Sequence, residues 1–152
     1  MRRKDRERSD APFVQHVLST ADELYVAFAT EGAPYVIPLN FVYDTDKIYI
    51  HCATEGRKLT LIERQPLVGF TTACEVEILR ERSTTRYSSI CGTGRARYVT
   101  DPVEKQEALR LLALRYNAHC QIPTPEPLLQ RTGVICIEVI EITGKYRNPD
   151  AS

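Results

Sequence analysis

A glycine followed by two cations, Gly56-Arg57-Lys58, is the most suggestive chemical feature of this sequence. Thr54 is placed to cap a helix that begins at Glu55 or Gly56, and the first-turn amides of that helix would lack intrahelical partners. Free amides and the helix dipole together favour an anion at that end. Arg57 would then be a bidentate donor and Lys58 a point charge, so the pattern indicates a phosphate site. Solvated cations, or cations paired with nearby carboxylates, are the alternative interpretation.

His51 is the second candidate for chemistry, because an imidazole can act as an acid–base group or pack beside a ligand. A strand histidine that is bonded to a neighbour is the simpler alternative. His51-Cys52 and His119-Cys120 together contain the residue types of a zinc site. Adjacent residues on a strand point to opposite faces, so one such pair rarely supplies two ligands. We therefore expect no metal site.

The composition narrows the class of protein. The 152 residues are expected to form one domain, 1–152, that is large enough to bury a core. Twenty basic and twenty acidic residues cancel, so we expect neither nucleic-acid binding nor membrane binding. The sequence has no apolar run approaching the roughly 20 residues of a membrane span and no signal-type segment, which predicts a cytoplasmic protein. Five widely spaced cysteines predict neither a disulfide framework nor a zinc ribbon.

The elements that must position these residues are mainly β, with peripheral helices. Asp10 would cap a short helix that ends near Ala21, and Asp101 and Glu104 form a capping-box pattern at the start of the strongest helix. Pro38 interrupts a β-branched and aromatic run, so that strand should have a bulge or lie at an edge. Six strands joined mostly by tight turns favour an antiparallel barrel with helices outside. The strands are expected at residues 23–30, 35–43, 47–53, 67–79, 87–100 and 132–145.

Three further patterns concern local structure and packing. Gly92 and Gly94 lie within a predicted strand, where glycine allows a bulge or a close backbone approach. Residues 121–126 predict a proline-broken loop before a short helical turn. The helix after Asp101 has one apolar face that we expect to be core, formed by Ala108, Leu109, Leu112, Ala113 and Tyr116.

Segments from most of these elements resemble the pyridoxamine 5′-phosphate oxidase-like flavoproteins, and within them the nitroimidazole-resistance (Nim-type) reductase branch. The segments are MRRKDRERSD, PYVIPLNFVYDTDKIYIHCATEGRK, YSSICGTGRARYV and IEVIEITGK. The resemblance implies a six-stranded antiparallel split β-barrel that forms a homodimer with FMN at the subunit interface. It implies an FMN-dependent oxidoreductase with a small-molecule electron donor and a small acceptor such as a nitroaromatic. A non-catalytic flavin-, haem- or deazaflavin-binding carrier, store or sensor remains the alternative, and a ligand-free interaction domain is a second one.

The resemblance also implies which residues contact the cofactor, with His51 as the catalytic candidate because it would lie close to the flavin. The chain has no tryptophan and ends EITGKYRNPDAS, so the resemblance does not extend to a site for pyridoxal phosphate. The implied contacts are Val36, Ile37, Pro38, Leu39 and Asn40 along the isoalloxazine and ribityl chain; His51, Cys52 and Ala53 beside the flavin; Gly56, Arg57 and Lys58 on the 5′-phosphate; and Ser88, Ser89, Ile90 and Gly92 from the second subunit.

Overall fold

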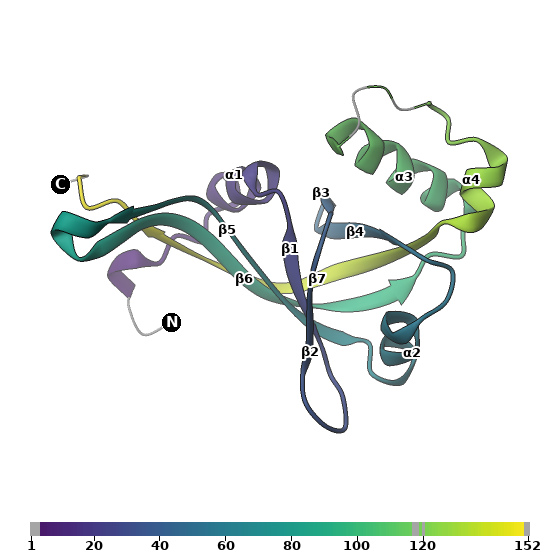
Figure 1. Cartoon of the computed structure of the whole chain (residues 1–152), viewed down its shortest axis with the longest axis horizontal. Helices are drawn as coiled ribbons and strands as arrows, with labels where there is room; N and C mark the ends of the chain where they lie inside the picture. Colours follow the sequence, from purple (N-terminus) through teal and green to yellow (C-terminus); the bar gives the residue numbers. More distant parts are fainter. Residues whose placement is uncertain (1–3, 117–118, 120, 151–152) are drawn as a thin grey trace.

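The computed structural model of the chain describes residues 4–116, 119 and 121–150, and seven antiparallel strands form one sheet within them (Figure 1). The strand order is β2-β1-β5-β6-β7-β4-β3. The strands are β1 (Leu24–Phe28), β2 (Tyr35–Leu39), β3 (Val42–Asp44), β4 (Lys47–Cys52), β5 (Leu67–Leu79), β6 (Thr84–Tyr98) and β7 (Gly133–Arg147). The helices are α1 (Ala11–Thr20), α2 (Arg57–Arg64), α3 (Pro102–Tyr116) and α4 (Glu126–Arg131), with 3₁₀ turns η1 (Lys4–Arg6) and η2 (Arg80–Arg82).

The strand predicted from residue 35 to 43 is broken at Asn40 and Phe41. Its first part, β2, pairs with β1, and its second part, β3, pairs with β4. The two edge strands of the sheet are therefore consecutive in the chain. This corrects the expected six-stranded barrel: the sheet has seven strands, and its hydrogen-bonded ladder is not closed. The break occurs because the Phe41 amide donates to the Tyr116 hydroxyl, at 3.1 Å, and not to another strand.

Pro38 lies on the edge strand β2, as the sequence predicts, because proline has no N–H to donate to a neighbouring strand. The prediction for Gly92 and Gly94 is also confirmed. The register of β6 against β7 shifts between Thr93 and Gly94. A Cβ at Gly92 would lie 2.6 Å from the Phe70 ring and would also collide with the Glu141 carbonyl oxygen, so glycine is the residue that fits.

Two groups of buried side chains hold the layers together. Helix α1 packs Val17 and Leu18 against one face of the sheet, where both are fully buried. Its Asp10 cap is confirmed, since the carboxylate accepts from the Phe13 amide at 3.1 Å. Helix α3 lies over the other end of the sheet and packs on Tyr49 of β4 and Val134 of β7.

The start of α3 is tied to the sheet by Glu104. Its amide donates to Asp101 at 3.1 Å, as the capping pattern predicts. Its carboxylate is not used for a reciprocal hydrogen bond to Asp101. It accepts instead two hydrogen bonds from Arg97, at 2.7 and 3.0 Å, and one from the Tyr49 hydroxyl at 3.1 Å. The bonds from Arg97 hold the pKa of Glu104 below its usual value. No helix in the described part of the chain has the length and apolar character that a membrane span needs.

Candidate functional site

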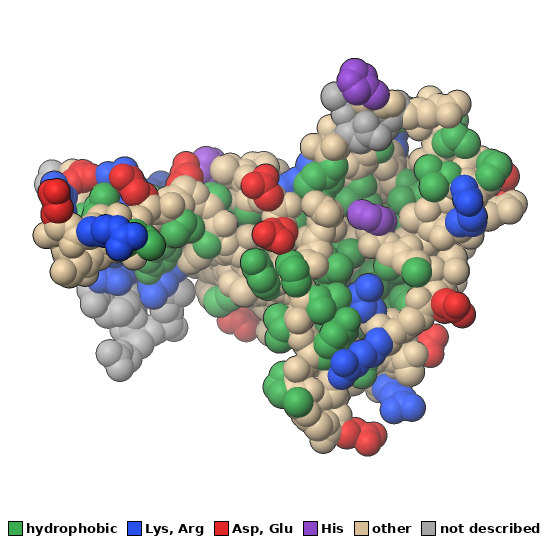
Figure 2. Space-filling view, in the orientation of Figure 1, with side chains coloured by type: hydrophobic (Ala, Val, Ile, Leu, Met, Phe, Trp, Pro, Cys, Tyr) green, Lys and Arg blue, Asp and Glu red, His purple; other side chains and the backbone are tan. Residues whose placement is uncertain are grey.

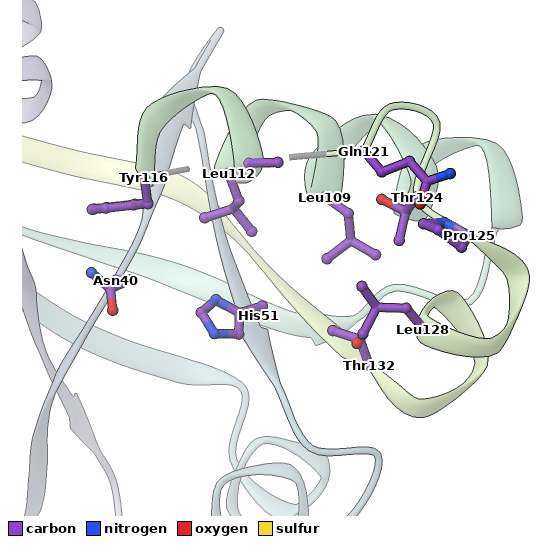
Figure 3. A pocket seen from close by; sticks show the side chains of 11 residues that line it. Asn40, His51, Leu109, Leu112, Tyr116, Gln121, Thr124, Pro125, Leu128 and Thr132 are labelled. Carbon is purple, nitrogen blue, oxygen red and sulfur yellow. The ribbon is translucent and has the colours of Figure 1, made fainter. Parts of the chain in front are cut away.

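A pocket of about 400 Å³ lies between the end of β4, the Asn40 junction and the segment from α3 to α4 (Figure 3). Leu109, Leu112 and Ala113 of α3 form one wall, and Pro125 and Leu128 form the opposite wall. None of the described residues that line the pocket is lysine, arginine, aspartate or glutamate. The lining therefore favours a small, uncharged and largely apolar molecule.

His51 is the titratable side chain that the sheet presents to this pocket. Side chains alternate along β4, so Tyr49 and His51 face α3 while Ile50 and Cys52 face the interior cluster under α1. The exposed imidazole of His51 points into the pocket in Figure 3. Cys52 does not share this position, and its partial burial raises the pKa of its thiol. The structure thus separates two adjacent residues that the sequence assigned to the same ligand.

Asn40 enters the pocket because α3 fixes the chain beside it. The Tyr116 hydroxyl accepts from the Phe41 amide and lies 2.9 Å from the carbonyl oxygens of both Phe41 and Asp22. The Arg115 guanidinium stacks 4.4 Å from the centre of the Phe41 ring and donates to the carbonyl of Leu18.

This role of Tyr116 differs from the sequence prediction, which placed it in the core. Leu109 and Leu112 of the same helical face are buried, whereas Tyr116 is 40% exposed and lines the pocket. Helical spacing alone could not separate a core tyrosine from one whose hydroxyl binds a distant backbone.

The start of α2 differs from the prediction in its cap. Gly56, and not Thr54, is the N-cap, with a φ of 130° that favours glycine and with no side-chain hydrogen bond to the first turn. The Arg57 guanidinium stacks 4.2 Å from the centre of the Tyr35 ring on β2. Among the described residues, neither Arg57 nor Lys58 has a carboxylate within ion-pair distance. Two cations and uncapped amides therefore lie together at one helix end.

Strand β2 turns alternate residues toward solvent. Val36, Pro38 and Asn40 are exposed, whereas Ile37 and Leu39 pack against the interior cluster. Figure 2 shows hydrophobic side chains along the face between the β1–β2 hairpin and the α3–α4 region, with basic side chains beside it. Cross-strand pairing extends this uncharged outer face from β2 to β6 in two rows: Val36, Ala27, Gly69 and Thr93, and Pro38, Tyr25, Thr71 and Cys91.

The sequence matches the family model of pyridoxamine 5′-phosphate oxidase over residues 12–146. The chain belongs to this family. Solved structures agree with that assignment. One is a candidate 5-nitroimidazole antibiotic resistance protein from Bacteroides thetaiotaomicron, which is 27% identical with a TM-score of 0.80 and is matched over 91% of this chain and 85% of its own. No curated protein matches the sequence significantly.

Two further members of this structural group are similar in fold at lower identity. The flavocytochrome Anf3 from Azotobacter vinelandii is 22% identical, with a TM-score of 0.82 over 97% of this chain and 72% of its own. The FAD and heme binding protein from Mycobacterium smegmatis is 18% identical, with a TM-score of 0.80 over 97% of this chain and 77% of its own.

In this member of the pyridoxamine 5′-phosphate oxidase family, the β6 residues expected to contact a second subunit lie away from the pocket. Ser88 is opposite Tyr146 of β7, whereas His51 is opposite Val134 near the other end of that strand. The side chains of Ser88 and Ile90 are buried within the chain itself. Ser89 is partly exposed, and Gly92 packs against Phe70 of the same chain.

Two predictions concern Ala53 and the second histidine–cysteine pair. Ala53 is exposed in the turn between β4 and α2. Cys120 lies outside the described residues, so the structure gives no geometry for the pair His119-Cys120. The four described cysteines are free thiols.

Proposed function

We propose that the chain is an FMN-dependent oxidoreductase that passes electrons from a small-molecule donor to a small, uncharged acceptor such as a nitroaromatic. In this proposal two copies form a homodimer, and FMN lies at the interface between them. The observation that carries it is the start of α2, where Gly56, Arg57 and Lys58 combine uncapped amides with two cations that no described carboxylate pairs.

The electrostatics of α2 favour a bound phosphate. Two cations at a helix N-terminus are unfavourable by about 0.3–1 kcal/mol each, because the dipole is positive there. The first turn of α2 has no acidic residue to offset them. A phosphate dianion would reverse this sign, with Arg57 as a forked donor, Lys58 as a point charge and the Gly56 backbone open to close approach.

The remaining parts of the proposed site have separate tasks. Val36 and Pro38 offer an uncharged surface for a flat ring, and the Asn40 amide offers one donor and one acceptor beside it. FMN, when bound, would supply the redox chemistry, and the protein would supply its binding and orientation. His51 orients the acceptor in the pocket and holds a proton on an imidazole nitrogen that faces it.

The pocket favours a neutral acceptor over a phosphorylated one. Leu109, Leu112 and Leu128 would cover an apolar ring, and no described lining residue is a cation that could pair with a phosphate ester. The chain's similarity to a candidate 5-nitroimidazole resistance protein supports the same choice. Pyridoxamine phosphate is therefore not the substrate in this proposal.

Removing the two cations tests the phosphate site. The double variant Arg57→Ala with Lys58→Ala should remain folded but bind FMN on the order of 100-fold more weakly or worse, since each charge-assisted hydrogen bond contributes about 1.5–3 kcal/mol. Arg64→Ala is the matched control, because it removes a cation from the last turn of the same helix. Flavin fluorescence quenching measures both affinities. Stoichiometric FMN in the double variant would refute the site.

Turnover separates an enzyme from a flavin carrier. The FMN-loaded protein should oxidise a reduced nicotinamide when a nitroimidazole is supplied, and His51→Ala should slow that step while FMN remains bound. Bound FMN without turnover, over a range of donors and acceptors, would favour the carrier, store or sensor. Sedimentation of the loaded protein tests the dimer, and a flavin-loaded monomer would contradict the interface.

Haem binding is a second candidate, because an exposed imidazole faces an apolar pocket and a histidine is a common axial ligand. The flavocytochrome and the FAD and heme binding protein share the fold. Titration with haemin would give a sharp Soret band that His51→Ala abolishes. A haem spectrum that survives this substitution would exclude His51 as the ligand.

A further inference from the structure

A group of three metal-binding side chains lies away from the pocket, where α1 crosses the sheet. His16 projects from α1, and Cys74 and Glu75 are adjacent on β5. The imidazole Nε2 of His16 is 3.2 Å from a carboxylate oxygen of Glu75. One ligand atom from each of the three residues lies within 4.8 Å of the other two. A small inward movement of these side chains would bring the three ligand atoms close enough together to bind a single metal ion.

A β-bulge brings the two neighbouring residues to the same point. In a regular strand Cys74 and Glu75 would point to opposite faces of the sheet. The register of β5 against β6 shifts between Cys74 and Glu77, and Glu75 has a φ of 54°, in the left-handed region that non-glycine residues rarely adopt. The rule that argues against His51-Cys52 as paired ligands therefore does not apply at Cys74-Glu75.

A second hydrogen bond, from Ser88, also orients the carboxylate of Glu75. Ser88 lies opposite Cys74 in the register, is 1% exposed, and donates its hydroxyl to the second carboxylate oxygen of Glu75 at 2.9 Å. That bond leaves the first oxygen directed at His16. Carboxylates that bind metals are commonly hydrogen-bonded in this way, because the partner fixes the ligand's orientation.

The three donors are an imidazole nitrogen, a thiol sulfur and a carboxylate oxygen, which is a set that favours Zn²⁺ over Ca²⁺ or Mg²⁺. Cys74 is buried, whereas the side chains of His16 and Glu75 are about half exposed, so an ion can enter from solvent. We propose that His16, Cys74 and Glu75 form a zinc site that fastens α1 to the bulge of β5. Binding displaces the thiol proton of Cys74 to solvent, uses His16 in its neutral form, and leaves a fourth position for water.

Cobalt is the first probe, because Co²⁺ binds at zinc sites. A thiolate-to-Co²⁺ charge-transfer absorption band then shows that a cysteine coordinates the ion. Untagged full-length protein titrated with Co²⁺ should develop this band at one ion per chain, and added Zn²⁺ should remove it. Cys74→Ser should abolish the band. Cys91→Ser is the matched control, since Cys91 is an exposed free thiol of β6 outside the group, and it should retain the band. Absence of the band, or its survival in Cys74→Ser, would overturn the proposal.

Zinc affinity tests the other two ligands. Competition with a chromophoric chelator should show at least 100-fold weaker Zn²⁺ binding in His16→Ala and Glu75→Gln, and a loss of about 10–100-fold in Ser88→Ala. Glu77→Gln is the control, because this nearby carboxylate pairs with Arg86 at 2.6 Å and not with His16.

His16 lies on the surface, so His16→Ala tests the site even if a variant at buried Cys74 fails to fold. Zn²⁺ should also raise the melting temperature of the wild type and not that of His16→Ala. Equal zinc affinity in wild type and His16→Ala would refute the site.

Discussion

Tyr116→Phe should separate the hydroxyl of this residue from its ring and show how far the Asn40 junction depends on α3. The substitution leaves the Phe41 amide and carbonyl without their partner, and both bonds are partly shielded from water. The contact with Asp22 is exposed, so water can replace the hydroxyl there. Because Tyr116 is itself 40% exposed, we take the lower part of the range for an unsatisfied backbone group, about 1–2 kcal/mol.

Urea unfolding followed by circular dichroism measures this loss, which corresponds to a melting temperature lower by about 2–8 °C for a chain of this size. The proposed function adds a second readout: FMN affinity should fall in Tyr116→Phe, because Asn40 would no longer be held at the edge of the pocket. Tyr25→Phe is the control, since the Tyr25 hydroxyl bonds to none of the residues that the structure describes. A stability change below about 0.5 kcal/mol in Tyr116→Phe, equal to that of Tyr25→Phe, would refute the reasoning.

Two further predictions concern the packing of the sheet and α3. Glu104→Gln should cost about 1–3 kcal/mol near neutral pH. The folded state lowers the pKa of Glu104, so its contribution is complete above the usual value of 4.5 and is lost as pH falls through the folded value. Urea unfolding near pH 7 and near pH 4 should therefore show a smaller difference from wild type at acid pH, and a constant difference would contradict this origin. Gly92→Ala should destabilise by about 1–3 kcal/mol because its Cβ meets backbone and ring atoms, whereas Gly32→Ala, with nothing within 4 Å, should be close to neutral in thermal melts. Equal melting temperatures for the two glycine variants would show that β6 can relax around an added methyl.

Local signals in the sequence predicted the elements that carry their own start and stop residues. Asp10 and Asp101 cap α1 and α3, as their positions indicate, because a cap is satisfied within a few residues of itself. Pro38 marked an edge strand for a similar reason, since the missing N–H is a property of one residue. These features depend on the chain within one or two turns.

The division of the predicted strand at Asn40 could not be read from the sequence. It depends on a hydrogen bond between Phe41 and Tyr116, which are 75 residues apart. The strand-forming residues on both sides of the break favour one continuous strand. Tyr116, which takes the Phe41 amide in place of a neighbouring strand, belongs to helix α3. The sequence pattern of that helix indicates only an apolar face.

The candidate site was predicted in part. His51 reaches the pocket, and the two cations after Gly56 lie at a helix start as expected, although the cap is Gly56 and not Thr54. A local pattern could not tell these two caps apart, because both residues are common at helix starts. The wall that includes Leu128 was missed, since residues 121–126 indicated a loop without showing which part of the sheet the loop covers.

Because Asn40 and Phe41 join β2 to β3, one short stretch of backbone connects the two opposite edges, or margins, of the sheet. The first and last described segments also meet, through a bridge between Glu7 and Lys145. A cut in the backbone would therefore act differently at different places. New ends at Gly32, in a hairpin with open space around it, would leave both margins tethered. New ends between Asn40 and Phe41 would release two independent strands with unpaired edges, which invites association between molecules.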